Sequence, residues 1–410
     1  MKLAKLSLAA VLIMGANAFA IDNVKVNGAT KLIYQTTDKS GSFEDNNDMF
    51  SKESAQAQVS ATLGVSANLI DGVSAGMEMQ ALSTLGLENQ LVMGVMNDTL
   101  PGGAGTDDAW NVSQMWIATT LGNTTAKIGR QELNTPLAFT EKWNIVKNTF
   151  EAAVLINSDV PKTTLVGAYV GGSNADTAKG LTTVNMPSDG STGFSQFYGG
   201  AYAAGAITTA IPMTTAQAWY YDVNTVATAT FFQTDTKIDM ITGSLQYATV
   251  DQVAAGAESN DVMAAKIAAD LGVVKLYGAY SQTGKSNTAV KVGINTATLD
   301  KTKIFTGAGS IYFDGNTALT NNTSAFKLGV SGKVGSFGLS AAYAQAKQEA
   351  DATRANNSAY DNDSSVVDLV VKNNIGPVAV KAVYTSYKTD TSASTDGTNN
   401  TLRIYATLKF

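Results

Sequence analysis

Apolar and polar residues alternate strictly over long stretches of the chain. From Ala55 to Leu69 every odd position is apolar and every even position is polar or glycine, and the alternation resumes from Val73 to Ala81. Successive side chains of a β-strand point to opposite faces, so each stretch predicts a strand with one apolar and one polar face. Asp71-Gly72 between them predicts a tight turn, and hence a hairpin. Both strands exceed the usual ~5–6 residues and reach the ~9–11 that a tilted membrane strand needs.

The chain ends on the same pattern. One face of the predicted last strand is apolar and carries the terminal aromatic residue: Leu402, Ile404, Ala406, Leu408 and Phe410. The other face is mostly polar: Arg403, Tyr405, Thr407 and Lys409. Such an ending resembles the signal by which the barrel assembly machinery of bacterial outer membranes recognises its substrates. Within this resemblance, Leu402, Ile404, Leu408 and Phe410 are the residues of the assembly signal.

Short turn signals alternate with long polar stretches along the chain. Besides Asp71-Gly72, short turns are predicted at Gly122-Asn123, Asn157-Ser158-Asp159, Gln233-Thr234-Asp235, Asp270-Leu271-Gly272, Gly335-Ser336 and Asn374-Ile375-Gly376. A further turn is predicted between Ala204 and Thr214, where Gly205 and Pro212 interrupt the pattern. The polar stretches predict long loops at 35–52, 83–108, 171–196, 284–302, 347–363 and 389–399. Short turns at one end and long loops at the other are typical of outer-membrane barrels.

These signals predict an all-β fold, a transmembrane antiparallel β-barrel of about 18 strands, with 16 left open. The turns would be periplasmic and the loops extracellular. No water reaches the hydrocarbon core, so the sheet must close until its first strand, around 24–32, pairs with its last. A barrel of this size is too wide for side chains to fill and leaves an aqueous channel. No linker divides the chain, so residues 21–410 are expected to form a single domain.

The start of the chain has the features of an export signal. Lys2 and Lys5 precede an apolar run, and Ala18-Phe19-Ala20 matches a cleavage site, so residues 1–20 are predicted to be a cleaved signal peptide. The chain contains no Cys and no His, which excludes Ser-His, Cys-His and His-ligated zinc sites. An enzyme is therefore not expected, and the net charge of −6 does not favour nucleic acid. The expected location is the outer membrane of a Gram-negative bacterium.

The loop after the third predicted hairpin, 133–149, carries the candidate constriction. Ionisable residues beside and within it are candidate constriction residues: Arg130, Glu132, Glu141, Lys142 and Lys147. The runs Gly129-Arg130-Gln131, Asn148-Thr149-Phe150 and Trp219-Tyr220-Tyr221-Asp222 resemble the OprD-like porins, and more closely the major outer-membrane porins of Campylobacter and its relatives. The resemblance implies an 18-stranded, trimeric porin that is narrowed by its third loop. OprD prefers basic amino acids as solutes. This chain departs from OprD in having only three Arg, so we do not extend that preference to it.

Strand parity predicts a basic inner wall over the last strands. The residues expected to face inward are Lys266, Lys275, Lys327, Lys333, Lys372, Lys381, Arg403 and Lys409, against Asp270 and Asp368. Acidic residues gather in the predicted loops instead, at 44–48, 107–108 and 361–363. One interpretation is that both sets are ordinary solvated faces. The other is a transverse field that aligns zwitterionic or carboxylated solutes, because charge rings set selectivity in pores.

The remaining possibilities concern ions, partners and a different class of protein. The acidic loop segments 45–48 and 361–363 are weak candidates for Ca²⁺ or for bridging lipopolysaccharide through divalent ions; neither has EF-hand spacing, and no cofactor is expected. The partners expected are outer-membrane lipid, two further copies of the chain and small hydrophilic solutes. The alternative function is an exported surface-layer or adhesin protein built of soluble β-sandwiches, which would need neither the terminal strand nor an uncharged outer row.

Overall fold

The computed structural model describes residues 21–87, 90–97, 109–176, 183–184, 193–287, 291–308, 313–351, 361–391 and 394–410. The predicted signal peptide and the acidic pair Asp107-Asp108 lie outside the described residues. No helix in the described part of the chain is long and apolar enough to cross a membrane.

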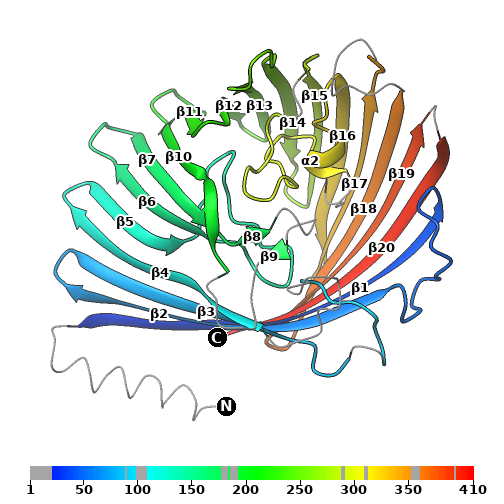
Figure 1. Ribbon diagram of the computed structural model, residues 1–410, viewed down its shortest axis with the longest axis horizontal. Helices are drawn as coiled ribbons and strands as arrows, with labels where there is room; N and C mark the ends of the chain where they lie inside the picture. The colour runs from blue at the N-terminus through cyan, green and yellow to red at the C-terminus, as the bar shows by residue number, and fades with distance from the viewer. Residues whose placement is uncertain are drawn as a thin grey trace.

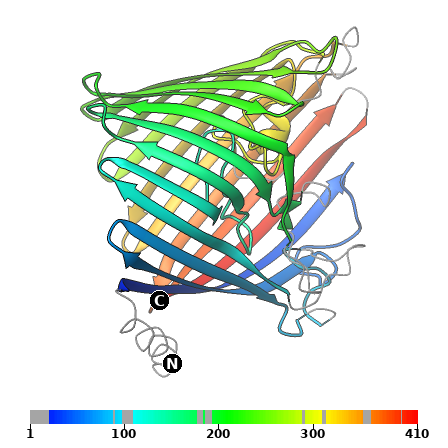
Figure 2. The same ribbon diagram turned by 60° about the vertical axis from the view of Figure 1, so that its left-hand side comes forward.

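The wall is one closed antiparallel sheet of 18 strands, which confirms the larger of the two predicted strand numbers (Figures 1 and 2). Its first strand pairs with its last, from Ala29 opposite Lys409 to Gly41 opposite Gly397, as closure requires. The wall strands are β1 (Asp22–Gly41), β2 (Ala55–Ile70), β3 (Val73–Ser83), β4 (Ala109–Leu121), β5 (Thr124–Gln131), β6 (Phe150–Asn157), β7 (Thr163–Ser173), β10 (Ser195–Thr208), β11 (Thr214–Val223), β12 (Ala227–Ile238), β13 (Ile241–Gln252), β14 (Asn260–Asp270), β15 (Val274–Thr283), β16 (Thr323–Val334), β17 (Phe337–Gln348), β18 (Asn362–Ile375), β19 (Val378–Thr391) and β20 (Ser394–Lys409).

Side-chain exposure on this wall is the reverse of that in a soluble sheet. On the outer face of β2 and β3, Leu63 opposes Met79, and these apolar side chains are 42% and 38% exposed. On the inner face, Gln58, Ser60 and Gln80 are buried. An apolar outer band around a polar interior is what lipid outside and water inside demand. The predicted hairpin over 55–81 is confirmed.

The last residue completes the seam. Phe410 exchanges backbone hydrogen bonds of 2.9 and 3.0 Å with Gly28 on β1. Its ring lies directly over Gly28, where a Cβ atom would come within 2.4 Å of the ring. The apolar face of β20 thus continues the outer band to the end of the chain, and glycine at 28 is required by this close approach.

The predicted turns are confirmed with one exception. Gln233-Thr234-Asp235 lies inside β12, and the turn comes later, at Asp239-Met240. Gln233 and Asp235 are polar because they face the lumen, where Asp235 accepts hydrogen bonds of 2.6 Å from both Gln233 and Ser244. Composition alone did not distinguish a polar inner face from a turn. The turn predicted between Ala204 and Thr214 does join β10 to β11.

Several loop boundaries differ from prediction. β1 runs to Gly41, and β19 and β20 extend to Thr391 and from Ser394, so polar residues assigned to loops there continue the ladder. The loop predicted at 284–302 instead runs from 284 to 322, and its described part includes the short helix α2 (Asp314–Thr317). The connection between β7 and β10 carries a small hairpin of β8 (Ala175–Asp176) and β9 (Thr183–Val184).

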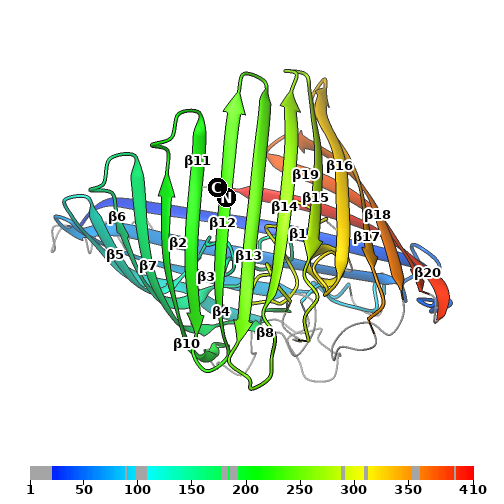
Figure 3. The same ribbon diagram turned by 90° about the horizontal axis from the view of Figure 1, so that it is seen from above.

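Two of the long connections, 132–149 and 284–322, fold into the space that the barrel encloses. Figure 3 shows the chain between β15 and β16, with α2, on the inner side of the strands. The largest buried side chains include Phe150, Phe313, Ile145 and Leu319, which come from these two loops or the wall beside them. The packed core therefore sits in the lumen, between loops 132–149 and 284–322 and the inner face of the barrel.

Candidate functional site: the constriction

One half of loop 132–149 is fixed to the inner face of β1, β2 and β3. The Lys31 ammonium donates to the carbonyl of Asn144 at 2.8 Å, and the Ser60 hydroxyl donates to that of Ile145 at 3.0 Å. Gln80 bonds both backbone groups of Lys147, at 3.2 and 3.3 Å. The polar inner residues of the strands thus satisfy the backbone of a loop that would otherwise be buried unpaired.

The other half of this loop is fixed to loop 284–322. Asn295 accepts from the amide of Phe139 at 3.1 Å and donates to its carbonyl at 2.9 Å. The amide of Thr296 donates to the carbonyl of Leu137 at 2.8 Å. The two loops therefore form one unit, and loop 284–322, which the sequence did not place in the lumen, forms half of the candidate constriction.

Three of the predicted constriction residues form an ion cluster with a residue of the wall. The Lys147 ammonium lies 2.8 Å from Glu78 on β3 and 2.5 Å from Glu132, and Lys142 also pairs with Glu132. Burial opposes ionisation of Glu132, but the hydrogen bonds from Lys142 and Lys147 hold the pKa of its carboxyl below its ordinary value. The cluster is electrically balanced, so it fixes the loop rather than creating a field.

Glu141 lies apart from this cluster, buried at the contact between the two loops. Its carboxylate accepts hydrogen bonds from Asn295 at 2.8 Å, from Trp143 at 3.0 Å and from the hydroxyl of Thr298. Burial raises the pKa of Glu141 even though these donors favour the charged form. Its role in the structure is to join the loops.

Arg130 is separated from the four loop residues with which the sequence grouped it. Its guanidinium lies 3.0 Å from Glu151 and 4.2 Å from the centroid of the Phe194 ring. The neighbours of Glu151 on β6, Phe150 and Ala152, belong to the apolar cluster in the lumen, so Glu151 points to the outer side of the wall. Arg130 pairs directly with Glu151 across the two strands and therefore points the same way.

The basic residues of the last strands share the inner face. Lys266 and Lys327 both align with Ala279 on the strand between them, and Lys372 opposes Lys381. Lys266 and Lys327 lie beside Phe305 and Gly307 of loop 284–322, and Arg403 lies beside Trp143 of loop 132–149. The other cations of this face lie near the short-turn ends of their strands: Lys275, Lys333, Lys372, Lys381 and Lys409. Lys275 forms an ion pair of 2.7 Å with Asp270 at that end.

Three cations of the inner face lie beside aromatic rings rather than carboxylates. Lys381 lies 3.9 Å from the centroid of Tyr405, Lys266 lies 4.3 Å from that of Phe305, and Arg403 lies 5.1 Å from that of Trp143. Within the described ranges, no carboxylate comes within ion-pair distance of these three cations. A ring stabilises a cation without cancelling its charge, so this side of the lumen keeps a net positive charge.

Other charged residues of the constriction were missed. Lys31 lies on the inner face of β1, and parity alone could have found it. Lys301 and Lys303 belong to loop 284–322; Lys301 pairs with Asp314 at 3.1 Å, and Lys303 donates to the backbone of Thr135 at 2.9 Å. Burial lowers the pKa of Lys303 to about 8. The signal for this loop was its apolar residues, Ile294, Ile304, Phe313 and Leu319, in an otherwise polar stretch.

The described residues of the site form no acidic cluster that could hold a metal ion. In the part of the chain that the structure covers, no three acidic side chains gather around a common point. Asp45 forms an ion pair of 2.6 Å with Lys39, and Asp361 accepts from the amide of Ala350 at 2.8 Å.

Solved structures resemble the whole barrel. Acinetobacter baumannii OccAB1 is similar over 94% of this chain and 96% of its own, with a TM-score of 0.72 and 13% identity. Pseudomonas aeruginosa OpdK, solved with vanillate, is similar over 94% and 99%, with a TM-score of 0.67 and 12% identity. P. aeruginosa OccK3 (OpdO) is similar over 94% of this chain and 96% of its own, with a TM-score of 0.65 and 12% identity. The chain has the fold of the OprD/Occ outer-membrane channels.

No protein-family model matches the sequence, and no curated protein matches it significantly. The fold is therefore established by structural similarity at low identity, and the narrower resemblance to the Campylobacter porins stays a prediction. A closed barrel of 18 strands contradicts the alternative of soluble β-sandwiches.

Proposed function

We propose that this protein forms a passive diffusion channel in the outer membrane of a Gram-negative bacterium, for small hydrophilic solutes and with a preference for anions. The observation that carries the proposal is the asymmetry of the constriction. Lys266, Lys381 and Arg403 of the wall have aromatic rings rather than carboxylates beside them, while Lys147 of the loop is paired with carboxylates. A net positive inner surface attracts anions and orients zwitterions.

The similar structures support this proposal at the level of fold. One of them, OpdK, was solved with vanillate, an aromatic carboxylate. The unneutralised cations Lys266, Lys381 and Arg403 would give the present channel a comparable attraction for carboxylates. Because the fold alone is shared at this identity, the permeant solute must be measured on this chain.

The test is the reversal potential of the purified protein in a planar bilayer under a KCl gradient. Lys266→Glu combined with Lys381→Glu should move the permeability ratio from chloride toward potassium. The matched control is Lys162→Glu, a change of the same charge at an exposed residue in a short turn. A double variant with the reversal potential of the unmodified channel would overturn the preference for anions, and electrical silence of the native protein would overturn the channel itself.

The trimer, the cleaved signal peptide, recognition of β20 by the assembly machinery and the contact with lipopolysaccharide are parts of the same proposal. Electrophoresis of the membrane fraction with and without boiling tests the trimer, because an intact assembly migrates more slowly than the unfolded monomer. N-terminal sequencing of the mature protein tests cleavage before Ile21. Removal of Phe410 should reduce assembly, since it removes both the seam hydrogen bonds and the ring over Gly28.

A further inference from the structure

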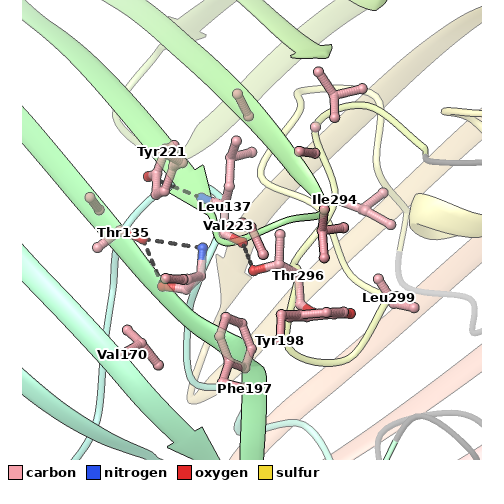
Figure 4. Close-up of a pocket in the computed structure, with 18 of the residues that line it drawn as sticks. Thr135, Leu137, Val170, Phe197, Tyr198, Tyr221, Val223, Ile294, Thr296 and Leu299 are labelled. Carbon is pink, nitrogen blue, oxygen red and sulfur yellow. Dashed lines mark hydrogen bonds between the residues drawn. The ribbon is translucent and has the colours of Figure 1, made fainter. Parts of the chain in front are cut away.

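The lumen contains an apolar cavity of about 440 Å³ on the side away from the basic wall. It lies between the two inward loops and the inner face of β7, β10, β11, β12 and β13. Figure 4 shows Leu137 and Ile294 from the loops facing Val170, Phe197 and Val223 of the wall. Its volume is within the ~300–1,000 Å³ that is usual for small-molecule sites in proteins.

The cavity owes its shape to an interruption in the wall. Opposite β7, the register jumps between Gln196 and Ala201 on β10, so the intervening residues leave the ladder. Gly199 and Gly200 in this bulge have φ values of +77° and +103°, which glycine adopts without strain. The bulge brings Phe197 and Tyr198 into the lining of the cavity.

Most of the polar side chains that line the cavity are hydrogen-bonded within the protein. Thr135 donates to the carbonyl of Ala138 at 2.8 Å, and the Tyr221 hydroxyl accepts from the amide of Leu137 at 3.4 Å. The hydroxyls of Tyr198 and Thr296 donate to carbonyls of the two loops, at 3.2 and 2.8 Å. Figure 4 draws the bonds that Leu137 makes with Tyr221 and Thr296 as dashed lines. They leave an apolar surface facing the cavity.

Charge is almost absent from the lining. Among the described residues that line the cavity, only Lys291 carries a charged side chain, and its ammonium donates to Asn316 at 2.6 Å. β7 and β10 contain no Lys, Arg, Asp or Glu at all. An ionised solute entering here would lose its water without gaining a counterion, whereas an uncharged apolar solute would gain from leaving water.

We propose that this cavity is a binding site for small uncharged apolar molecules of one or two rings, separate from the path that anions take along the basic wall. The site goes beyond the proposed channel function and does not depend on it. An apolar ligand in such a cavity leaves water and contacts apolar side chains instead, which favours binding without any hydrogen bond. The channel would thus admit two chemical classes to two sides of one lumen.

The absence of Cys from the chain allows a direct test. Ala229→Cys places one thiol in the cavity lining, and Thr407→Cys places one on the inner face of β20, opposite Lys31. Each variant is reconstituted into lipid nanodiscs and labelled with uncharged N-phenylmaleimide or with an anionic methanethiosulfonate. The thiol at position 229 should prefer the uncharged reagent and the thiol at position 407 the anionic one, each relative to a small-molecule thiol.

Naphthalene, uncharged and apolar, is the probe for occupancy. At about ten times its dissociation constant it should slow labelling at position 229 about tenfold and leave labelling at position 407 unchanged. Equal rates with and without naphthalene at position 229, or equal slowing at both thiols, would overturn the site. Unheated electrophoresis verifies that each variant is a closed barrel. Because labelling needs no ion current, failure here is distinguishable from failure of the channel proposal, which the reversal potential decides.

Discussion

The two sides of the lumen are built from the same alternating strands but hold their loops in different ways. On the side formed by β1, β3 and β20, loop 132–149 packs through Ile145 and Val146 and is also attached through charged and polar groups, namely Lys31, Gln80 and Lys147. On the side formed by β7 and β10–β13, both loops pack through Leu137, Ile294, Ile304 and Leu319 against Trp219 and Phe231. The first side also carries Lys381, which has an aromatic ring rather than a carboxylate beside it, and the second side encloses the apolar cavity. Selectivity by charge and binding of apolar solutes can therefore occur in one channel.

The largest expected effect is on the apolar side. Leu319→Ala should destabilise the protein by about 2–5 kcal/mol, because Leu319 is fully buried in the cluster and its removal leaves a void. Denaturant unfolding in detergent, followed by tryptophan fluorescence, measures the loss. Leu299→Ala is the control: Leu299 belongs to the same loop but is 41% exposed, and its truncation should cost well under half as much. Equal costs would show that the apolar side is not tightly packed.

A smaller loss is expected on the charged side. Lys147→Met leaves Glu78 and Glu132 without their shared cation, at a cost of about 2 kcal/mol because the three side chains are largely but not fully buried. Lys142→Met should cost less than about 0.5 kcal/mol, since Lys142 is 62% exposed. The unfolding midpoints of the two variants measure the difference. In a Glu132→Gln background the cost of Lys147→Met should fall, and a cost that is unchanged would contradict the coupling.

Ionic strength should affect the anion preference of the basic side but not ligand binding on the apolar side, with no charged residue mutated. Raising the ionic strength from about 0.1 to 1 M shortens the screening length from about 10 to 3 Å. The preference for anions should then fall toward equal permeability, measured as the reversal potential at a fixed concentration ratio. In the Ala229→Cys variant, protection of the thiol by naphthalene should not weaken over the same range, because apolar burial does not rely on charge. Parallel loss of both would mean that the two sides are not independent.

The smallest effect concerns pH at the junction of the loops. Burial raises the pKa of Glu141 above its ordinary 4.5, so the folded protein binds this proton more tightly than the unfolded one. The resulting stabilisation is present below pH 4.5 and is lost as the pH rises through the raised pKa. The effect should be the smallest of the four, because the donors Asn295, Thr298 and Trp143 favour the charged form and so oppose the effect of burial. Glu141→Gln should flatten this part of the stability–pH profile, and an unaltered profile would assign it to another group.

Strand parity explains why much of the wall could be predicted. Alternation alone predicts Lys266, Lys381 and Arg403 on the inner face, and their contacts with rings inside the lumen agree with that prediction. The same alternation also places Lys31 on the inner face of β1, opposite Thr407. Arg130 shows the limit of a short motif, because its position beside the third loop did not reveal that its strand turns it outward toward Glu151.

The sequence by itself determined the barrel, its closure and the division of each strand into an outer and an inner face. It could do so because lipid outside and water inside impose an alternation of apolar and polar side chains, with a period of two residues, along the strands. Only the tertiary structure decided that loops 132–149 and 284–322 meet inside, and that an apolar side of the lumen accompanies the basic wall that strand parity predicts. Such contacts join residues as far apart as Phe139 and Asn295, 156 positions along the chain, and no local pattern encodes that distance.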